Sequence, residues 1–441
     1  MSAYISCITV SGGVPILNRR FGKNLKPLTF PQLASLNGVA LFGKTIDVTL
    51  LTSRSKDCKF LWRDYHGSLR LILVTNNDSL SDIHCHRLLD YVFLSMILVV
   101  GFEDLIMQKN IDRVKRDLRA SYGLIDTLIA NLQPNEKIST NFGDLVGSVD
   151  CVISTDANNV QNYLDSFTES VDSTYGCVFI DGKIVTSTKN WWGLHPDELT
   201  LLSLIVQINS ESTISDIPIF LPIKSPTVPF RLVSAELIHG VRVAVLCGPS
   251  PSLEEINFQL CKQWHSSFSL LRSVHAIIPR GFPPFQINTC ILGFLLVNLE
   301  KRRVLSSMQP HFQKTTSSTV SHDELPSSQG AVMQPSRKLD LLRSFYKNVV
   351  GPIFPDILIL NNHNVDENGD PHSSRVSHSK VLHPVRETYL CSEYHKCYAT
   401  QIGQYQMFCL FVAGIPNHNM RSTTEQTLQS MLKDKQFGLI K

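Results

Sequence analysis

Hydrophobic and polar residues repeat the same order of predicted elements in three successive stretches of the chain. Each stretch opens with two alternating runs typical of a hairpin, continues with an amphipathic helix and three further strands, and ends in a helix. The hairpins are expected at residues 4–17, 174–187 and 290–307, and the helices after them begin at Phe30, Pro196 and Leu339. The pattern predicts an α+β protein of three similar modules, each an antiparallel five-stranded sheet with helices packed on its faces.

The first module shows the pattern in most detail. We expect its later strands at 46–52, 59–64 and 68–75, followed by helices at 84–107 and 110–131. The first of these helices is apolar nearly all round, as buried helices are. Its strongest apolar run, from Tyr91 to Phe102, is shorter than the roughly 20 residues that span a membrane.

The second of these helices carries a basic face. It is formed by Arg113, Lys115, Arg116 and Arg119. We interpret it as a solvated surface, since most runs of like charge on a helix are. An acidic partner or an anionic membrane surface is the alternative.

Polar segments between the patterns set the expected domain limits. The first domain covers 1–132, a linker covers 133–146, and the second and third domains cover 147–278 and 286–441. Two segments inside the third domain are rich in Ser, Thr, Pro, Gln, Asn, Asp and His and are predicted to be disordered. These insertions lie at about 309–337 and 361–380.

Composition adds little beyond a globular protein with several cores. The hydrophobic fraction is 43%, and the net charge of +3 is too small to indicate nucleic acid. The eleven cysteines are spread singly, many within apolar strands, which is typical of the reduced thiols of a cytosolic protein. The N-terminal apolar run has no basic patch before it, so no signal peptide is predicted.

One stretch matches the phosphate-binding P-loop by letter, with Gly38, four residues, and then Gly43-Lys44-Thr45. A real P-loop has a strand before the glycine loop and a helix after it. Here a helix is predicted before the stretch and a strand after it. We therefore favour a helix that closes onto the sheet, with Gly38 permitting close backbone approach and Gly43 ending the helix. A P-loop nucleotide hydrolase using Gly38–Thr45 is the alternative.

Other candidate chemistry is weak, and no catalytic, cofactor-binding or metal-binding residue is predicted. Cys391, His395 and Cys397 match no standard zinc spacing. A calcium-loop imitation beginning at Asp366 has Pro371 where glycine is required. The pair Trp191-Trp192 is interpreted as a core plug on a loop, with an exposed interface anchor as the alternative.

The order of strands and helices in each module resembles the longin domain of vesicle-trafficking proteins. More specific runs resemble the Fuzzy family of planar cell polarity effectors. They include Leu36–Val39, Phe93–Leu105, Lys115–Tyr122, Ser225–Pro229 and Leu246–Pro251. This similarity is dense up to about residue 300 and thinner beyond it. The resemblance implies three longin-like units, which are the three modules described above.

The resemblance also implies a function. Members of the family are non-catalytic scaffold subunits that pair with Inturned, a related longin protein, and with Fritz, a WD-repeat protein. The assembly acts at the ciliary base and on the cytoskeleton, in ciliogenesis, intraflagellar transport and planar cell polarity. Its implied clients are Rab and Rab-like small GTPases. Guanine-nucleotide exchange by such a complex would need no acid, base or nucleophile, only different affinities for two states of the GTPase.

By analogy with other longin pairs, the first helix and its neighbouring strand should meet the partner longin. The expected interface residues are Leu33, Leu36, Asn37, Val39 and Phe42. Each of these side chains could instead face its own sheet. A membrane tether or coat adaptor, also a longin role, is a further alternative function.

Overall fold

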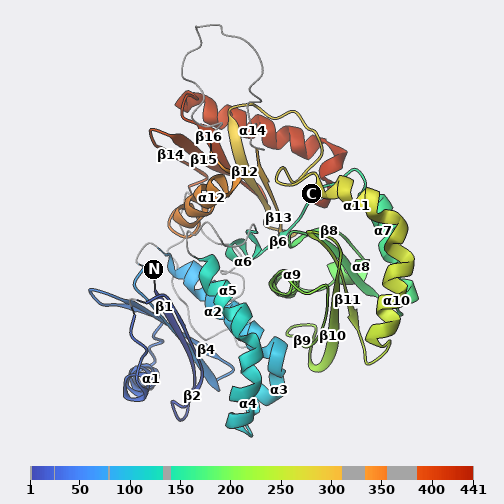
Figure 1. Ribbon diagram of the computed structural model, residues 1–441. Coiled ribbons are helices and arrows are strands. Elements are labelled where there is room, and N and C mark those ends of the chain that lie inside the picture. The colour runs from blue at the N-terminus through green and yellow to red at the C-terminus, as the bar shows by residue number, and fades with distance from the viewer. Residues whose placement is uncertain are drawn as a thin grey trace. The chain divides into compact units, whose positions relative to one another are not determined.

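The computed structural model describes residues 2–23, 25–77, 80–132, 141–309, 333–354 and 385–440. The chain divides into two compact units. The first is formed by Met1–Gln133 and Asn158–Arg272, and the second by Pro134–Ala157 and Ser273–Lys441. The first unit contains two sheets and the second unit contains one. Three sheets with helices confirm the predicted α+β class (Figure 1).

The first sheet has the strand order β2-β1-β5-β4-β3, with every neighbouring pair antiparallel. Its strands in chain order are Ala3–Thr9, Pro15–Phe21, Thr52–Arg54, Lys59–Tyr65 and Leu69–Thr75. Helix α1 (Phe30–Thr45) covers one face and α2 (Asp82–Val100) covers the other (Figure 1). The central strand β5 is therefore buried on both sides along its whole length.

Three predictions for the first module are wrong in part. The predicted strand 46–52 does not form, and β3 is only Thr52–Arg54. The backbone N–H groups of Ile46 and Val48 bond back to the Gly43 carbonyl at 3.1 and 2.9 Å, so this segment closes the helix instead of joining the sheet.

The predicted helix 84–107 is broken at Gly101, whose φ of +86° suits glycine. A Cβ on Gly101 would also lie 3.0 Å from the Phe220 ring. The chain continues as α3 (Phe102–Met107). The predicted helix 110–131 is divided by a 3₁₀ turn. Its parts are α4 (Ile111–Asp117), η1 (Leu118–Ser121) and α5 (Tyr122–Asn131).

Helix α2 is a core helix. By length and composition alone it could cross a membrane, since its 19 residues are longer than the apolar run seen in the sequence. However, 72% of its most apolar window is buried inside the protein. Its side chains pack on the first sheet and on β9 of the second sheet, which agrees with the prediction of a buried helix.

The second sheet repeats the topology of the first, with the order β8-β7-β11-β10-β9. Its strands in chain order are Tyr175–Ile180, Lys183–Ser187, Ile214–Leu221, Ser225–Ile238 and Val241–Cys247. Its helices are α7 (Ala157–Ser170), α8 (Lys189–Trp192), α9 (Pro196–Ile208), α10 (Leu253–Trp264), η2 (His265–Ser267) and α11 (Phe268–His275). Trp191 is fully buried against Phe179, which agrees with a core plug, although it lies on the short α8 and not on a loop.

The third sheet has six strands in the order β14-β15-β16-β12-β13-β6, where five were predicted. Strands β12 to β16 are Ile291–Asn298, Arg303–Met308, Glu387–Cys391, His395–Ile402 and Tyr405–Val412. The added strand β6 (Val149–Asp150) pairs parallel with β13. The helices are α6 (Gly143–Val146), α12 (Pro335–Val349), α14 (Asn417–Lys433) and η4 (Lys435–Leu439).

The predicted domain limits remain predictions, but β6 comes from the range assigned to the second domain and pairs in the third sheet. The first predicted insertion reaches too far, because residues 335–337 belong to α12. Its main part, 310–332, and the second insertion, 361–380, lie outside the described residues, as does the calcium-loop imitation.

A buried polar network, which we call the clamp, holds α1 on the first sheet. Arg70 on β5 is 1% exposed and donates from Nε and Nη2 to both carboxylate oxygens of Asp64 on β4, at 2.6 and 2.9 Å. Its Nη1 donates to Oδ1 of Asn37 on α1 at 2.7 Å. Asn37 in turn donates from Nδ2 to the Val10 carbonyl at 3.1 Å. Lys44, near the end of α1, pairs with Asp64 at 2.5 Å.

The clamp keeps its carboxylate charged. Burial by itself raises the pKa of Asp64, but the hydrogen bonds and positive charges of Arg70 and Lys44 outweigh this effect and lower the pKa below its ordinary value. The stabilisation by this carboxylate is therefore present above the unfolded pKa of about 4 and is lost as pH falls through the lower folded value. At neutral pH the clamp is intact.

Replacing Arg70 by Met should destabilise the first module by about 3 kcal/mol, because Asp64 and Asn37 would lose a buried partner. Hydrogen exchange should show lost protection in α1, together with a lower thermal unfolding midpoint. Arg20→Met, at an exposed position of β2, is the matched control and should change neither. Equal protection of α1 in both variants would contradict the role of the clamp.

Candidate functional site

Helix α1 is apolar on two faces. On its inner face, Leu33 and Ala40 are 1% and 4% exposed and pack on Ile8, Trp62 and Ile72 of the first sheet. Its outer face carries Val39 and Phe42, which are 57% and 66% exposed. Further exposed apolar residues precede and follow them in the chain: Phe30, Ile46, Val48 and Leu51. We call Val39 and Phe42 the outer face.

Local sequence explains why α1 forms and where it ends. The Gln32 side chain accepts a hydrogen bond from the Thr29 backbone N–H at 2.8 Å, and Pro31 lies in the first turn. At the other end a Cβ on Gly43 would lie 2.8 Å from the Val48 carbonyl oxygen, so only glycine lets the chain turn back there. The helix nevertheless runs two residues past Gly43, to Thr45. The prediction that Gly43 ends the helix is wrong by that half turn.

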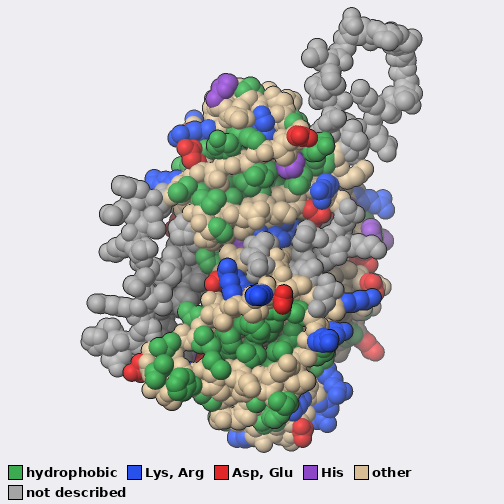
Figure 2. All heavy atoms as spheres, turned by 90° about the vertical axis from the view of Figure 1, so that its left-hand side faces the viewer, with side chains coloured by type: hydrophobic (Ala, Val, Ile, Leu, Met, Phe, Trp, Pro, Cys, Tyr) green, Lys and Arg blue, Asp and Glu red, His purple; other side chains and the backbone are tan. Residues whose placement is uncertain are grey.

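The structure separates the five predicted interface residues into two groups. Leu33 and Asn37 are buried toward their own sheet, and Leu36 is half-buried against the same core. Only Val39 and Phe42 project outward. The exposure of the apolar residues beyond Thr45 was missed because their alternation resembles a strand. Figure 2 shows hydrophobic side chains gathered over the lower part of the molecule, where the first module faces the viewer.

The P-loop lookalike does not have the geometry of a phosphate site. Gly38 and Gly43 both lie within α1, where the backbone N–H groups serve the helix, and Lys44 is paired with Asp64. The predicted close approach at Gly38 is also wrong, since a Cβ there would meet nothing within 4 Å. Gly38 is exposed, and because it has no side chain the backbone beside Val39 is uncovered.

The arginines of the predicted basic face are exposed, and acidic residues lie beside them. Arg113 and Arg116 are 62% and 71% exposed. Both lie within 4 Å of Asp117, and Arg113 also approaches Asp104. Arg119 is exposed and Lys115 half-buried. This surface is less basic than the spacing of its lysine and arginines alone indicates.

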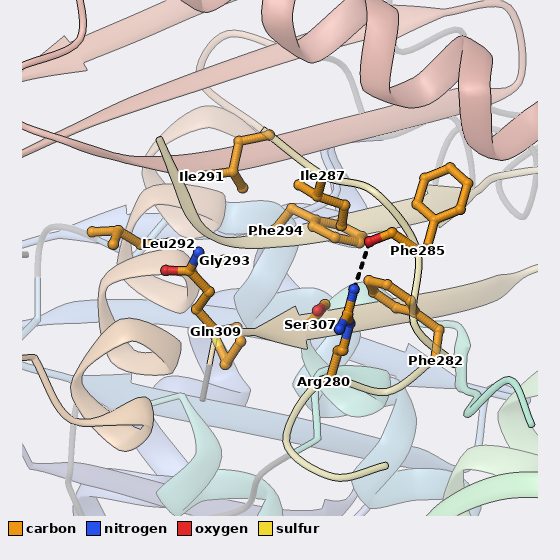
Figure 3. A pocket seen from close by; sticks show the side chains of 11 residues that line it. Arg280, Phe282, Phe285, Ile287, Ile291, Leu292, Gly293, Phe294, Ser307 and Gln309 are labelled. Carbon is orange, nitrogen blue, oxygen red and sulfur yellow. Dashed lines mark hydrogen bonds between the residues drawn. The ribbon is translucent and has the colours of Figure 1, made fainter. Parts of the chain in front are cut away.

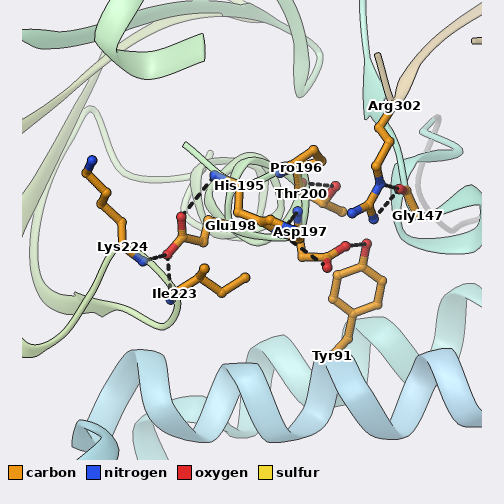
Figure 4. A network of polar contacts seen from close by, with 10 residues as sticks. All are labelled: Tyr91, Gly147, His195, Pro196, Asp197, Glu198, Thr200, Ile223, Lys224 and Arg302. Carbon is orange, nitrogen blue, oxygen red and sulfur yellow. Dashed lines mark hydrogen bonds and ion pairs between the residues drawn. The ribbon is translucent and has the colours of Figure 1, made fainter. Parts of the chain in front are cut away.

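A buried carboxylate in the second module was not singled out from the sequence. Glu198 at the start of α9 is fully buried and accepts hydrogen bonds from the backbone N–H groups of His195, Ile223 and Lys224 (Figure 4). Its neighbour Asp197 accepts a hydrogen bond from the Tyr91 hydroxyl of α2 at 3.1 Å. Oε1 of Glu198 holds the turn between β9 and β10, and Oε2 caps the start of α9. The arrangement ties the turn to the helix and is structural.

A cavity of about 170 Å³ lies in the second compact unit, beside β12 (Figure 3). Its walls are mainly apolar, with Phe282, Phe285 and Phe294, and Arg280 at its side donates to the Phe285 carbonyl at 2.6 Å. Among the described residues, no group of three His, Cys, Asp or Glu side chains is placed to hold a metal ion. Cys391 pairs with Lys396 in the register of β14 and β15, so its side chain lies on the opposite face of the sheet from His395 and Cys397.

Comparison with known proteins agrees with this geometry. Models of the first, second and third longin domains of FUZ, MON1 and HPS1 match residues 3–128, 171–266 and 290–435. The Protein fuzzy homolog of Xenopus tropicalis is 33% identical over 438 residues, which is 99% of both chains. The homologs of Mus musculus and Homo sapiens are each 32% identical, over 97% or more of both chains. The chain therefore belongs to the Fuzzy family and carries three longin domains.

Proposed function

We propose that this protein is a non-catalytic scaffold subunit of a longin heterodimer, and that the outer face of α1 is where the partner longin docks. The implied partner is an Inturned-like protein, with a Fritz-like WD-repeat protein in the same assembly. Its clients would be Rab or Rab-like small GTPases, and its place the cytoplasm at the ciliary base. Family membership supports this proposal. The exposed outer face carries it.

The outer face has the features of a docking surface. A surface helix normally has one apolar and one polar face, and the second apolar face of α1 is left in water. Val39 and Phe42 are one helical turn apart, so a partner could cover them together. Aromatic side chains such as Phe42 often carry much of an interface's binding energy. The exposed Gly38 beside them would allow a partner backbone to come close.

Regulation of a GTPase fits a protein of this kind. Nucleotide exchange requires a surface that binds one state of the GTPase better than another, and no acid, base or nucleophile. The buried carboxylate of Glu198 accepts hydrogen bonds from three backbone N–H groups. The proposed role is therefore binding, with any exchange activity a property of the complex.

Replacing both Val39 and Phe42 by Asp should weaken the heterodimer at least about 30-fold, corresponding to about 2 kcal/mol. The reason is that two charges would have to be desolvated where apolar groups now dock. Titration of the purified protein against an Inturned homologue measures the change. Because both side chains are exposed, the thermal unfolding midpoint should stay the same.

Phe258→Asp on α10 is the matched control, because Phe258 and Phe42 are both 66% exposed. It should leave the affinity unchanged. If both variants bind the partner as tightly as the unaltered protein, the outer face is not the docking surface. If no Rab-type GTPase binds the intact pair, the scaffold proposal itself is wrong.

The nucleotide hydrolase alternative makes the opposite prediction at Lys44. We expect neither the unaltered protein nor Lys44→Ala to bind ATP or GTP in equilibrium dialysis, because Lys44 is engaged with Asp64. The substitution should cost less than about 1 kcal/mol in stability, as for other partly exposed ion pairs. If the unaltered protein binds nucleotide and Lys44→Ala does not, the result would favour the nucleotide hydrolase hypothesis.

A membrane tether or adaptor is the second candidate function, favoured by the exposure of Arg113, Arg116 and Arg119. Reversing these charges and that of Lys115 to Glu should change flotation with anionic liposomes by less than about three-fold, because Asp104 and Asp117 already offset part of the charge. Flotation of neutral liposomes is the control. A complete loss of flotation in the variant would support the membrane role instead.

A further inference from the structure

The third sheet ends in an unusually open edge strand. Among the described residues, strand β14 pairs only with β15, and its outer side is the edge of the sheet. Tyr389 and Leu390 within it are 62% and 51% exposed. Val385 before the strand and Tyr394 after it are 51% and 63% exposed. Four large apolar or aromatic side chains thus lie in water within ten residues of one edge.

The other sheet edges in the described chain are protected. Helices α4 and α5 pack against β2, and α2 packs on β9. Strand β3 has only three residues, every residue of β8 is buried, and β6 closes the far edge of the third sheet. Natural proteins also protect edges with Lys or Pro, and β14 contains neither. Only β14 combines length, exposure and an apolar sequence.

The hydrogen-bond pattern shows which backbone groups face outward. The Gln401 N–H donates to the Arg386 carbonyl at 2.8 Å, and the Ser392 N–H donates to the His395 carbonyl at 2.9 Å. The register between these points has no shift. Since bonding alternates along an antiparallel strand, Glu387, Tyr389 and Cys391 direct their N–H and C=O groups away from β15. No strand in the described part of the chain takes them up.

The charges around this edge balance one another, since exposed Arg386 before the strand is offset by exposed Glu393 after it. Glu387 is the one charged residue of β14, and it accepts hydrogen bonds from Tyr398 at 2.6 Å and from Arg421 at 3.3 Å. Arg421 also donates a hydrogen bond from Nε to the carboxylate of Glu425 at 3.0 Å. An acidic or basic segment would therefore gain little here. An uncharged segment would gain contact with Tyr389 on one face and Leu390 on the other.

We propose that β14 is a docking strand, to which an extended, uncharged segment of a partner protein adds as a further strand. Main-chain hydrogen bonds to Glu387, Tyr389 and Cys391 would hold the segment, and the exposed side chains would select apolar or aromatic residues. A second copy of the chain is a poorer occupant. Two copies would meet along the five residues of β14, a length of only about 17 Å. A contact of that length buries far less than the roughly 1,200 Å² of surface that stable pairs of folded proteins bury.

A blocked peptide that alternates valine and threonine is a suitable probe. Methylation of the backbone nitrogens along one edge stops the peptide pairing with itself and leaves the other edge free to pair with β14. Fluorescence anisotropy with the full-length protein should show saturable binding. Hydrogen exchange should show new protection confined to residues 385–394. A peptide methylated at every nitrogen should not bind.

Tyr389→Pro tests the backbone contact directly. It removes an N–H that faces outward, so the pairing with β15 survives while affinity for the peptide should fall at least about ten-fold. Tyr389→Lys, which keeps the backbone N–H, should also weaken binding because it introduces a charge on the edge. Phe258→Lys is the matched control, since Phe258 is 66% exposed but lies on α10, in the other compact unit. Thermal unfolding should be alike in all three variants.

Three results would overturn the proposal. The first is no saturation at millimolar peptide, and the second is equal binding by Tyr389→Pro and the unaltered protein. The third is a concentration-dependent dimer of the free protein that Tyr389→Pro abolishes, because that would identify a second copy as the occupant. The test is independent of the outer face of α1, since Val39→Asp with Phe42→Asp should leave peptide binding unchanged.

Discussion

The clamp of Arg70, Asp64 and Asn37 is the interaction on which the first longin domain depends. A guanidinium that is 1% exposed must be paired, and it finds its partners on a neighbouring strand and on α1 at once. This fixes the rotation of α1 about its own axis. Once Asn37 points inward, Leu33 and Ala40 must also face the sheet, and Val39 and Phe42 must face away.

The same constraint separates folding from recognition along one short helix. The inner face packs on the sheet, and Lys44 pairs with Asp64. Because the segment that imitates a phosphate loop is part of this helix, its backbone N–H groups are hydrogen-bonded within the helix and cannot bind a phosphate. The outer face adds nothing to the folded core. A chain that keeps such a surface in water gains from it only when a partner covers it, and heterodimer formation is the role we propose for it.

The fold was largely predictable from the sequence and the outer face was not. The spacing of hydrophobic residues predicts three cycles of hairpin, helix and strands. The sequence also predicts the burial of Trp191. Periodicity could not say which side of α1 faces the sheet, because Leu33 and Val39 are equally apolar and only the buried Arg70 decides between them. Ile46 and Val48 alternate as strand residues do, but hydrogen bonds to Gly43 hold them in a helix end. The two-residue strand β6 carries no local signal, since pairing across more than 150 residues of sequence creates it.

Photo-crosslinking of the assembled complex tests the central claim most directly. A benzophenone amino acid would replace Phe42 in one sample and the equally exposed Phe258 in another. If the outer face of α1 receives the partner longin, irradiation joins the Inturned homologue to position 42 and not to position 258. Equal crosslinking at both positions, or none at position 42 in a complex that still co-purifies, would contradict the account.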